Sequence, residues 1–309
     1  MKNFIAIADA SPAEIKRILQ RATQLREQKR RGTRHRPALD RKTLALIFEK
    51  PSLRTRVSFE QAIHELGGHT IALGADVGLS KRESVRDVIG VLEGMVDGVV
   101  ARVFEHRKLV DMASFGGIPV INALSDLLHP CQAMADALTM WDEFGEDLRG
   151  RTLAFVGDGN NIARSLAVLA GKLGMNYVIA SPPGYQIAPD FIAEYLSAPC
   201  QPAPKFVHDP HEAVRGADVV YTDIWASMGQ EHEREARRKA FARYQVNGDL
   251  LKLAASHAIV MHCLPAAPDA EIADDVKYGP HSRIFRQAHN RLHVQKGLLA
   301  VLFDGEANQ

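Results

Sequence analysis

The feature that most constrains this chain is an apolar run that leads, through a short polar turn, into an amphipathic helix. Residues 43–48 are apolar after Thr43, which is typical of a buried strand. After Ser52 the apolar spacing becomes helical, and Gly67 and Gly68 mark the end of the helix. The predicted apolar face of this helix comprises Val57, Phe59, Ala62, Ile63 and Leu66. A strand that leads directly into a helix in this way is typical of an α/β fold.

The turn between this strand and this helix has the chemistry of an anion-binding site. Ser52 stands at the N-cap position, and Arg54, Thr55 and Arg56 follow in the first helical turn. Free backbone N–H groups, a helix dipole, two hydroxyls and two guanidiniums then lie together, and this combination favours a phosphate. A capped helix with solvated arginines is the alternative that the pattern leaves open.

Length and charge limit the class of protein. With 309 residues the chain is long for one core and suits two domains of about 150 residues each. The 38 Lys and Arg residues balance the 37 Asp and Glu residues, so no global field attracts nucleic acid or an anionic membrane. The basic run at 26–36 contains no Phe, Tyr or Trp, and we interpret it as the solvated end of the first helix.

The cysteines and the N-terminus predict the compartment. The chain has three cysteines, Cys131, Cys200 and Cys263, and none of them form a Cys-x-x-Cys motif. An odd number of cysteines without this motif argues against a disulfide framework or a structural zinc site. The first residues contain no apolar h-region, and no stretch reaches the roughly 18 apolar residues of a membrane span. We therefore expect a cytoplasmic protein.

Strands and helices alternate along the first half of the chain. After a helix that starts at Ser11, the predicted strands are 43–48, 69–73, 98–102 and 118–122, and the predicted helices between them begin near 53, 84 and 107. This alternation predicts a parallel sheet whose ligands collect at the carboxyl ends of the strands. Ser52–Thr55 and Arg102 would share that edge. The Gly-punctuated segment 74–83 reads as a functional loop.

A second alternation follows a helix at 130–144, within which we place the domain boundary. Its predicted strands are 152–156, 176–180, a short one near Phe206, 218–222 and 258–261. The fold class is therefore α/β, with two doubly wound parallel-sheet domains. The last helix, at about 287–302, has no strand after it, and we expect it to pack back on the first domain.

The segment Gly157-Asp158-Gly159 follows a strand and precedes a helix, as in a dinucleotide-binding motif. Ile162 occupies the place of the third glycine, and the next strand ends at Ala180 without an acid for a ribose hydroxyl. Both observations disfavour a nicotinamide cofactor. The two Asn residues that follow could instead hold a small zwitterion.

Several single residues have more than one interpretation. Asp223 ends a strand beside a Gly-containing loop, so it suits an ammonium group or a helix N-cap equally. Cys263 could be a nucleophile, a metal ligand with His262, or a small buried hydrophobe. His129 alone reads as a structural imidazole, and Arg291 stands at the start of the last predicted helix.

Taken together, these segments resemble the aspartate/ornithine carbamoyltransferase family. The matching segments are 48–56 (Phe-Glu-Lys-Pro-Ser-Leu-Arg-Thr-Arg), 129–132 (His-Pro-Cys-Gln), 158–161 (Asp-Gly-Asn-Asn), 223–229 ending in Ser-Met-Gly, 262–265 (His-Cys-Leu-Pro) and 290–291 (Asn-Arg). The first two resemble signatures shared across the family. The next three resemble the ornithine branch, because aspartate carbamoyltransferases lack the Ser-Met-Gly loop.

The resemblance implies substrate-binding residues, matched by position. Carbamoyl phosphate would be bound by Ser52, Leu53 through its backbone, Arg54, Thr55, Arg102, His129, Gln132, Arg291 and backbone groups of Cys263 and Leu264. Ornithine would be bound by Asn161, Asp223, Ser227 and Met228. The residues expected to act in catalysis are Arg54, Arg102, His129, Asp223 and Cys263. Neither a cofactor nor a metal is implied.

The resemblance also implies organisation and partners. Residues 1–135, completed by the C-terminal helix at about 287–309, would bind carbamoyl phosphate, and residues 136–286 would bind ornithine. The reaction would give citrulline and phosphate. Family members are trimers, so we expect a homotrimer or an assembly of trimers, with the loop around Gly78–Glu83 reaching a neighbouring subunit. No nucleic acid or membrane partner is expected.

Some positions depart from the family pattern. Leu53 and Gly78 stand where many members have polar residues, Val88-Ile89-Gly90 replaces a common Thr-Ala-Arg, Ala267-Pro268 replaces a basic stretch, and Gln287 and His289 replace acids. These changes leave a modified ornithine open as the acceptor, although the Ser227-Met228-Gly229 loop favours free ornithine. A metabolite-binding regulator on a similar frame is the competing class, but it would not need separate anion and amino-acid sites.

Overall fold

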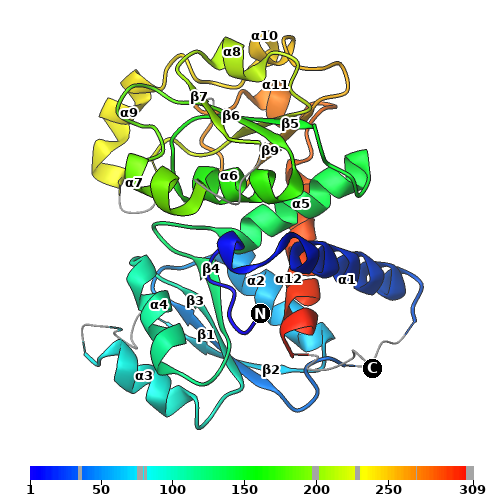
Figure 1. Cartoon of the computed structure of the whole chain (residues 1–309), viewed down its shortest axis with the longest axis vertical. Coiled ribbons are helices and arrows are strands. Elements are labelled where there is room, and N and C mark those ends of the chain that lie inside the picture. Colours follow the sequence, from blue (N-terminus) through cyan, green and yellow to red (C-terminus); the bar gives the residue numbers. More distant parts are fainter. Residues whose placement is uncertain are drawn as a thin grey trace. The chain divides into compact units, whose positions relative to one another are not determined.

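The computed structural model of the chain describes residues 1–33, 37–74, 79, 82–196, 202–226, 230–268 and 270–303. They form two compact units, which can be followed along the chain by colour in Figure 1. Unit 1 comprises Met1–Ala135 and His289–Gln309, and unit 2 comprises Asp136–Ala288. The chain passes between the units inside α5 (Pro130–Phe144) and again inside α12 (Ile284–Phe303).

Unit 1 is built on a four-stranded parallel sheet in the order β2-β1-β3-β4. Its strands are β1 (Thr43–Phe48), β2 (His69–Leu73), β3 (Gly98–Arg102) and β4 (Val120–Leu124). The first three have the predicted bounds. β4 begins two residues later than predicted, since Pro119 has no N–H to donate to the ladder.

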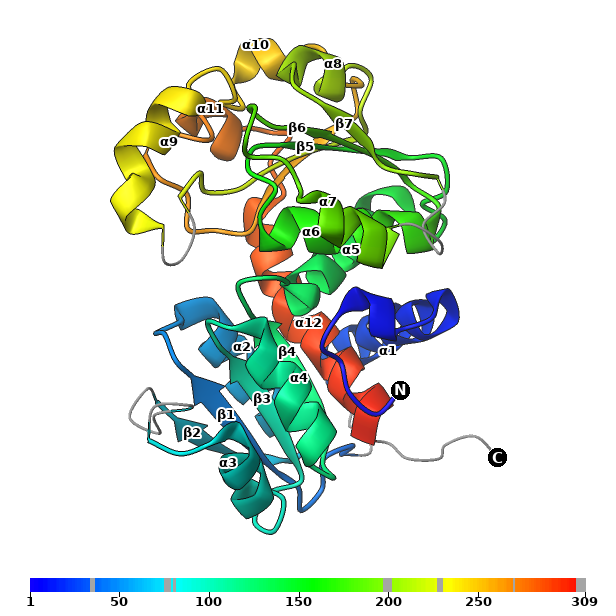
Figure 2. The ribbon, with the colours of Figure 1, turned by 60° about the vertical axis from the view of Figure 1, so that its left-hand side comes forward.

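Helices cover both faces of this sheet (Figure 2). α2 (Leu53–Glu65) lies on one face, and α3 (Val85–Leu92) and α4 (His106–Phe115) lie on the other, where they pack against apolar side chains of β1 and β3. The predicted apolar face of α2 is buried except for Val57, which is 56% exposed. That part of the prediction was wrong, because Val57 lies about 200° around the helix from Phe59.

The C-terminal helix α12 packs against α1 (Pro12–Arg30) in unit 1, as we expected. A Cβ on Gly297 would lie only 2.5 Å from the backbone oxygen of Ile18, so the missing side chain allows the close approach. α12 begins earlier than predicted. Arg291 therefore lies inside the helix and not at its start.

Unit 2 is built on a five-stranded parallel sheet in the order β7-β6-β5-β8-β9. Its strands are β5 (Thr152–Val156), β6 (Asn176–Ala180), β7 (Lys205–Val207), β8 (Val219–Thr222) and β9 (Ile259–His262). Each lies within a residue or two of its prediction, which confirms the α/β fold class with two parallel sheets. No helix in the described ranges is long and apolar enough to cross a membrane.

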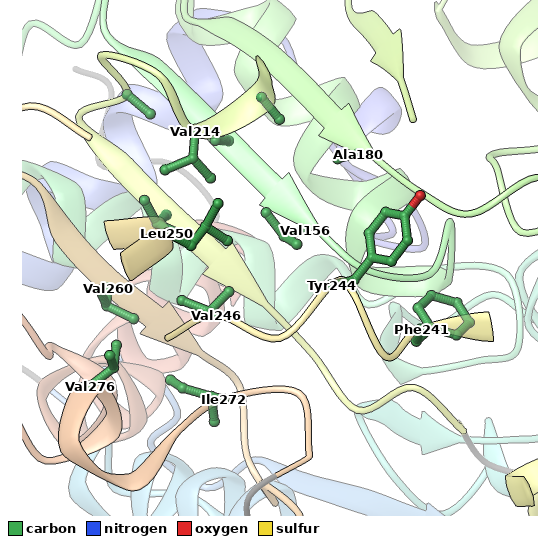
Figure 3. Packing of buried hydrophobic residues seen from close by; sticks show 14 of the residues in the cluster. Val156, Ala180, Val214, Phe241, Tyr244, Val246, Leu250, Val260, Ile272 and Val276 are labelled. Carbon is green, nitrogen blue, oxygen red and sulfur yellow. The ribbon is translucent and has the colours of Figure 1, made fainter. Parts of the chain in front are cut away.

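Helices also cover both faces of the second sheet. α6 (Asn161–Leu173) lies on one face in Figures 1 and 2. On the other face lie α8 (Pro210–Val214), α10 (Gly248–Leu251) and α11 (Asp274–Lys277). Figure 3 shows the apolar core on that side, where Val156 of β5 and Val260 of β9 point toward Val214, Leu250 and Val276 of these short helices.

The strand order places the candidate site residues. In unit 1 the connections leaving the neighbouring strands β1 and β3 run in opposite directions, and in unit 2 the same holds for β5 and β8. Ligands bind at such switch points, outside the carboxyl ends of the strands. The exits of β1 and β3 carry Ser52–Thr55 and Arg102. The exits of β5 and β8 carry Asn161 and Asp223.

Glu65, at the end of α2, joins three helices of unit 1. It forms ion pairs with Lys29 of α1 and with Lys296 of α12, whose Nζ lies 2.7 Å from Oε2. Lys296 is 1% exposed. Burial raises the pKa of Glu65, but hydrogen bonds from Gln61 and the two lysines outweigh it and lower the pKa to about 2.

We expect Glu65→Gln to lower the free energy of unfolding by about 1–3 kcal/mol at pH 7, because Lys296 stays buried without its carboxylate. Since the folded pKa lies below the unfolded one, the contribution is full above about pH 4.5 and is lost as the pH falls toward 2. Thermal unfolding between pH 7 and pH 2.5 should show the difference in Tm shrinking with falling pH.

The control in the same helix is Glu60→Gln, which breaks only the exposed ion pair with Arg56. That change should alter stability by less than about 0.5 kcal/mol. Equal losses in the two variants would contradict the role of Glu65.

Candidate functional site

Three arginines from distant parts of unit 1 converge on the turn after β1, and we call them the arginine cluster: Arg54, Arg102 and Arg291. Arg102 donates from Nη1 to the hydroxyls of Ser52 at 2.9 Å and Thr55 at 3.4 Å. Arg291 donates from Nη2 to the same Thr55 hydroxyl at 2.7 Å and from Nη1 to the side-chain oxygen of Gln132. The acceptors of these four bonds are neutral hydroxyl and amide oxygens.

Arg54 differs from the other two. In the described part of the chain no hydrogen bond or ion pair occupies its guanidinium, and its side chain is partly buried. The side chain of Ser52 does not cap α2, so the first-turn N–H groups also lack a side-chain acceptor. A partly buried guanidinium beside open N–H groups at a helix N-terminus suits an anion.

His129, the residue before α5, is buried beside the cluster. Burial is the main cause that holds the pKa of His129 well below its usual value, and the charges of Arg291, Arg102 and Arg54 lower it further. The imidazole is therefore neutral at pH 7 and can donate one N–H without adding a fourth positive charge. Leu53 contributes only backbone here, since its side chain is 76% exposed.

Cys131 is a different kind of cysteine from Cys263. Its thiol is buried and donates to the backbone oxygen of Asn122. Burial raises the pKa of the Cys131 thiol to about 12, against a smaller opposing effect of Arg291. Cys131 therefore stays protonated and serves as packing.

In unit 2 the carboxylate of Asp223 lies at the exit of β8, is 7% exposed and accepts two hydrogen bonds. Asn160 donates from Nδ2 to Oδ2 at 2.8 Å, and the Cys263 thiol donates to Oδ1 at 2.9 Å. We call these three side chains the carboxylate cluster. Asp223 is not the N-cap of any helix in the described ranges, so the N-cap interpretation is wrong for this part of the chain.

His262, Cys263 and Asp223 offer atoms within 4.8 Å of one another, the spacing of a metal site. Both ring nitrogens of His262 are already used, however. Nδ1 accepts from the Leu264 N–H at 2.8 Å, so Nε2 carries the proton and faces the carboxylate of Glu271 at 3.1 Å. His262 thus shapes the loop that carries Cys263 and Leu264, and a metal would have to break this arrangement.

Backbone geometry explains why glycine stands at positions 157 and 159, just after β5. Gly157 has a φ of +150°, which disfavours a side chain. A Cβ on Gly159 would lie 2.4 Å from the backbone nitrogen of Ile187. This turn lets Asn160 cap α6 by accepting from the Ile162 and Ala163 N–H groups while its amide donates to Asp223.

The structure brings most of the predicted site residues together within each unit. Ser52, Arg54, Thr55, Arg102, His129, Gln132 and Arg291 gather in unit 1, and Asn161, Asp223, Cys263 and Leu264 lie at the strand exits of unit 2. Ser227, Met228 and Gly78 lie outside the described residues. Sequence reasoning missed Asn160 as the partner of Asp223, although its N-cap position was a signal.

Comparison with known proteins identifies the class to which this site belongs. The family model "Aspartate/ornithine carbamoyltransferase, carbamoyl-P binding domain" matches residues 2–142, and "Aspartate/ornithine carbamoyltransferase, Asp/Orn binding domain" matches residues 149–302. The chain belongs to the aspartate/ornithine carbamoyltransferase family.

Similar proteins come from the ornithine branch. The chain is 46% identical over 307 residues to the ornithine carbamoyltransferase of Pyrococcus abyssi, covering 98% of this chain and 96% of that protein. The structure of ornithine carbamoyltransferase from Pyrococcus furiosus matches with a TM-score of 0.94 and 44% identity over 99% of this chain and 98% of that one. The enzyme from Thermus thermophilus matches with a TM-score of 0.87 and 41% identity, over 98% of this chain and 99% of that one.

We expect Gly159→Ala to lower the free energy of unfolding by about 1–3 kcal/mol, because the new Cβ meets the backbone at Ile187. Urea unfolding followed by circular dichroism measures the loss. Gly248→Ala is the control in the same unit, since its Cβ would meet nothing closer than 3.5 Å. A Gly159→Ala variant as stable as the control would contradict the close approach.

Proposed function

We propose that this protein transfers the carbamoyl group of carbamoyl phosphate to the δ-amine of L-ornithine, giving L-citrulline and phosphate. The observation that carries the proposal is near-full-length identity of 46% to ornithine carbamoyltransferases. The arginine cluster in unit 1 and the buried carboxylate of Asp223 in unit 2 support it, because they offer opposite charges at separate strand exits. Formation of citrulline from the two substrates by the purified protein tests it directly.

Phosphate binding is the proposed role of the arginine cluster. Ser52, the backbone of Leu53, Arg54, Thr55, Arg102 and Arg291 would neutralise the phosphate of the donor and so make it a better leaving group. Arg54 is the main candidate, since nothing in the described ranges competes for its guanidinium. The phosphate of the donor would then supply the counter-charge of the Arg54 guanidinium.

Activation of the carbonyl is the proposed role of the groups beside the cluster. As the amine attacks, negative charge grows on the carbamoyl oxygen, and donors already aimed at it lower the barrier by about 3–4 kcal/mol each. Thr55, Arg102 and neutral His129 would supply such donors, and Gln132 with backbone groups of Cys263 and Leu264 would hold the carbamoyl amide. No covalent intermediate is needed, because the donor is already an activated anhydride.

The acceptor amine must lose a proton before it attacks. A free alkylammonium titrates near 10, so its site must favour the neutral form. Asp223 would bind and orient the amino acid together with Asn161, Ser227 and Met228. Cys263 hydrogen-bonds Asp223 at 2.9 Å, so this pair would relay the proton.

Assembly, compartment and acceptor identity form part of the proposal. We propose a homotrimer, or an assembly of trimers, in the cytoplasm, in which the loop around Gly78–Glu83 serves a neighbouring subunit. Free ornithine is the proposed acceptor. Assays with acetylornithine, putrescine and aspartate beside ornithine test that choice, since faster turnover of any of these would replace it.

We expect Arg54→Ala to raise the KM for carbamoyl phosphate and to reduce kcat/KM by about 10²–10³, the loss typical of one such donor. Arg56→Ala is the control from the same motif, since Arg56 is exposed and pairs with Glu60. Its kinetics should stay within about twofold of wild type. Near-normal kinetics of Arg54→Ala would refute the phosphate assignment.

Asp223→Asn should raise the KM for ornithine at least tenfold, an energy of about 1.4 kcal/mol, because the ammonium loses its counter-charge. Binding of carbamoyl phosphate, measured by calorimetry, should stay within about twofold. An equal loss of both substrates would contradict the division of roles between Asp223 and the arginine cluster.

A further inference from the structure

One ion pair of unit 1 has no part in the proposed chemistry. Glu49 and Lys108 form an ion pair of 2.7 Å between Oε1 and Nζ, and both side chains are nearly buried, with 12% and 9% exposure. Glu49 directly follows β1, and Lys108 lies in the first turn of α4, beyond the exit of β3. The pair therefore spans the two strand exits that carry Arg54 and Arg102.

Glu49 is attached to the exit of β3 at three points. Its backbone N–H donates to the Arg102 oxygen at 3.0 Å, its Oε2 accepts from the Phe104 N–H at 2.7 Å, and its Oε1 accepts from Lys108. One of these bonds is to Arg102 itself. The other two hold the chain just after Arg102, so Glu49 sets how far the turn at Ser52–Thr55 stands from the Arg102 guanidinium.

We infer that Lys108 is a positioning residue for carbamoyl phosphate, which acts through Glu49 to hold the exits of β1 and β3 in register. This inference rests on the proposed function. Lys108 touches no substrate group in this account. Its ammonium fixes the Glu49 carboxylate and compensates its negative charge, which would otherwise lie close to a site for a dianion.

Two charged neighbours of Lys108, Glu105 and Arg107, make it possible to distinguish a positioning role from a general effect of charge near the site. Glu105 is a second carboxylate that pairs with Lys108, at 3.5 Å, but its side chain is 69% exposed. Arg107 is exposed as well and pairs with Asp111 on the outside of α4. The chain thus offers two matched controls from the same helical turn or its N-cap, one of each charge.

The first test is a kinetic comparison of Lys108→Met with Arg107→Met and Glu105→Gln. Misplacing one side of the site should raise the KM for carbamoyl phosphate about tenfold to a hundredfold in Lys108→Met and leave the KM for ornithine within about twofold. Both controls should stay within about twofold for both substrates. An unchanged KM for carbamoyl phosphate, or equal losses for both substrates, would overturn the inference.

A double-mutant cycle tests whether Lys108 acts through Glu49. Glu49→Gln, Lys108→Met and the double variant should show strongly non-additive effects on the KM for carbamoyl phosphate, with the double variant no worse than the poorer single one. Additive effects would show that Lys108 acts independently of Glu49. The double variant leaves no buried charge without a partner, whereas Lys108→Met leaves Glu49 without its ammonium. The double variant can therefore still be assayed if Lys108→Met folds poorly.

Calorimetric titration with inorganic phosphate separates this inference from the proposed function. A wild-type protein that forms no citrulline would refute the function, but its phosphate affinity still reports on the site. Phosphate affinity reduced about tenfold in Lys108→Met and unchanged in Arg107→Met would support the positioning role in that case too. Equal phosphate affinity in wild type and Lys108→Met would overturn it.

Discussion

The rest of the unit 1 site depends on the two hydrogen bonds that the Thr55 hydroxyl accepts from arginines. The donors are Arg102 and Arg291, residues that lie 47 and 236 positions away in the sequence. Two guanidiniums repel each other, so bringing both to one neutral oxygen costs energy unless an anion joins them. The fold keeps this arrangement through rigid elements: β3 carries Arg102, α12 carries Arg291, and the first turn of α2 carries Thr55. This arrangement is the basis on which we propose that a dianion binds here.

The same architectural rule produces the second site. In each sheet, neighbouring strands lead to helices on opposite faces, and the exits of those two strands carry the polar side chains. The first sheet presents positive charge there and the second presents Asp223, whose oxygens are oriented by Asn160 and Cys263. One fold, used twice, thus provides one site suited to an acidic donor and one suited to a basic amino acid, and the chemistry differs only through the side chains.

The sequence predicted what is encoded locally. The strands of the first sheet follow from short segments rich in apolar residues, and the start of α1 follows from Ser11, Pro12 and Glu14. The turn after β1 could be proposed as an anion site because Ser52, Arg54 and Thr55 are neighbours in the chain. Arg102 could be placed at the same edge, because it ends a predicted strand. The family resemblance then supplied the roles of His129 and Arg291, which single-residue reasoning could not interpret.

What the sequence did not predict depends on contacts between distant residues. No local pattern links Asn160 to Asp223 or Lys108 to Glu49, since the partners meet only after the strands align. The start of α12 was placed too late, because the apolar spacing before Gln287 is weak and that residue is held by buried partners, Asp136 and Tyr221. Val57 was misplaced for the opposite reason: its apolar side chain suggested burial that the helix geometry does not give it.

The central claim of the proposed function is that Arg54, Arg102 and Arg291 create a positive field to which a phosphate dianion binds. Histidine ¹⁵N NMR of His129, recorded with and without inorganic phosphate, tests this most directly, because the imidazole senses all three charges. The proposed function predicts that the pKa of His129 lies well below its ordinary value in the free protein, because of burial and the three arginines, and that it rises when phosphate binds. An imidazole that titrates near its ordinary value in the free protein, or a pKa that does not respond to phosphate, would contradict it.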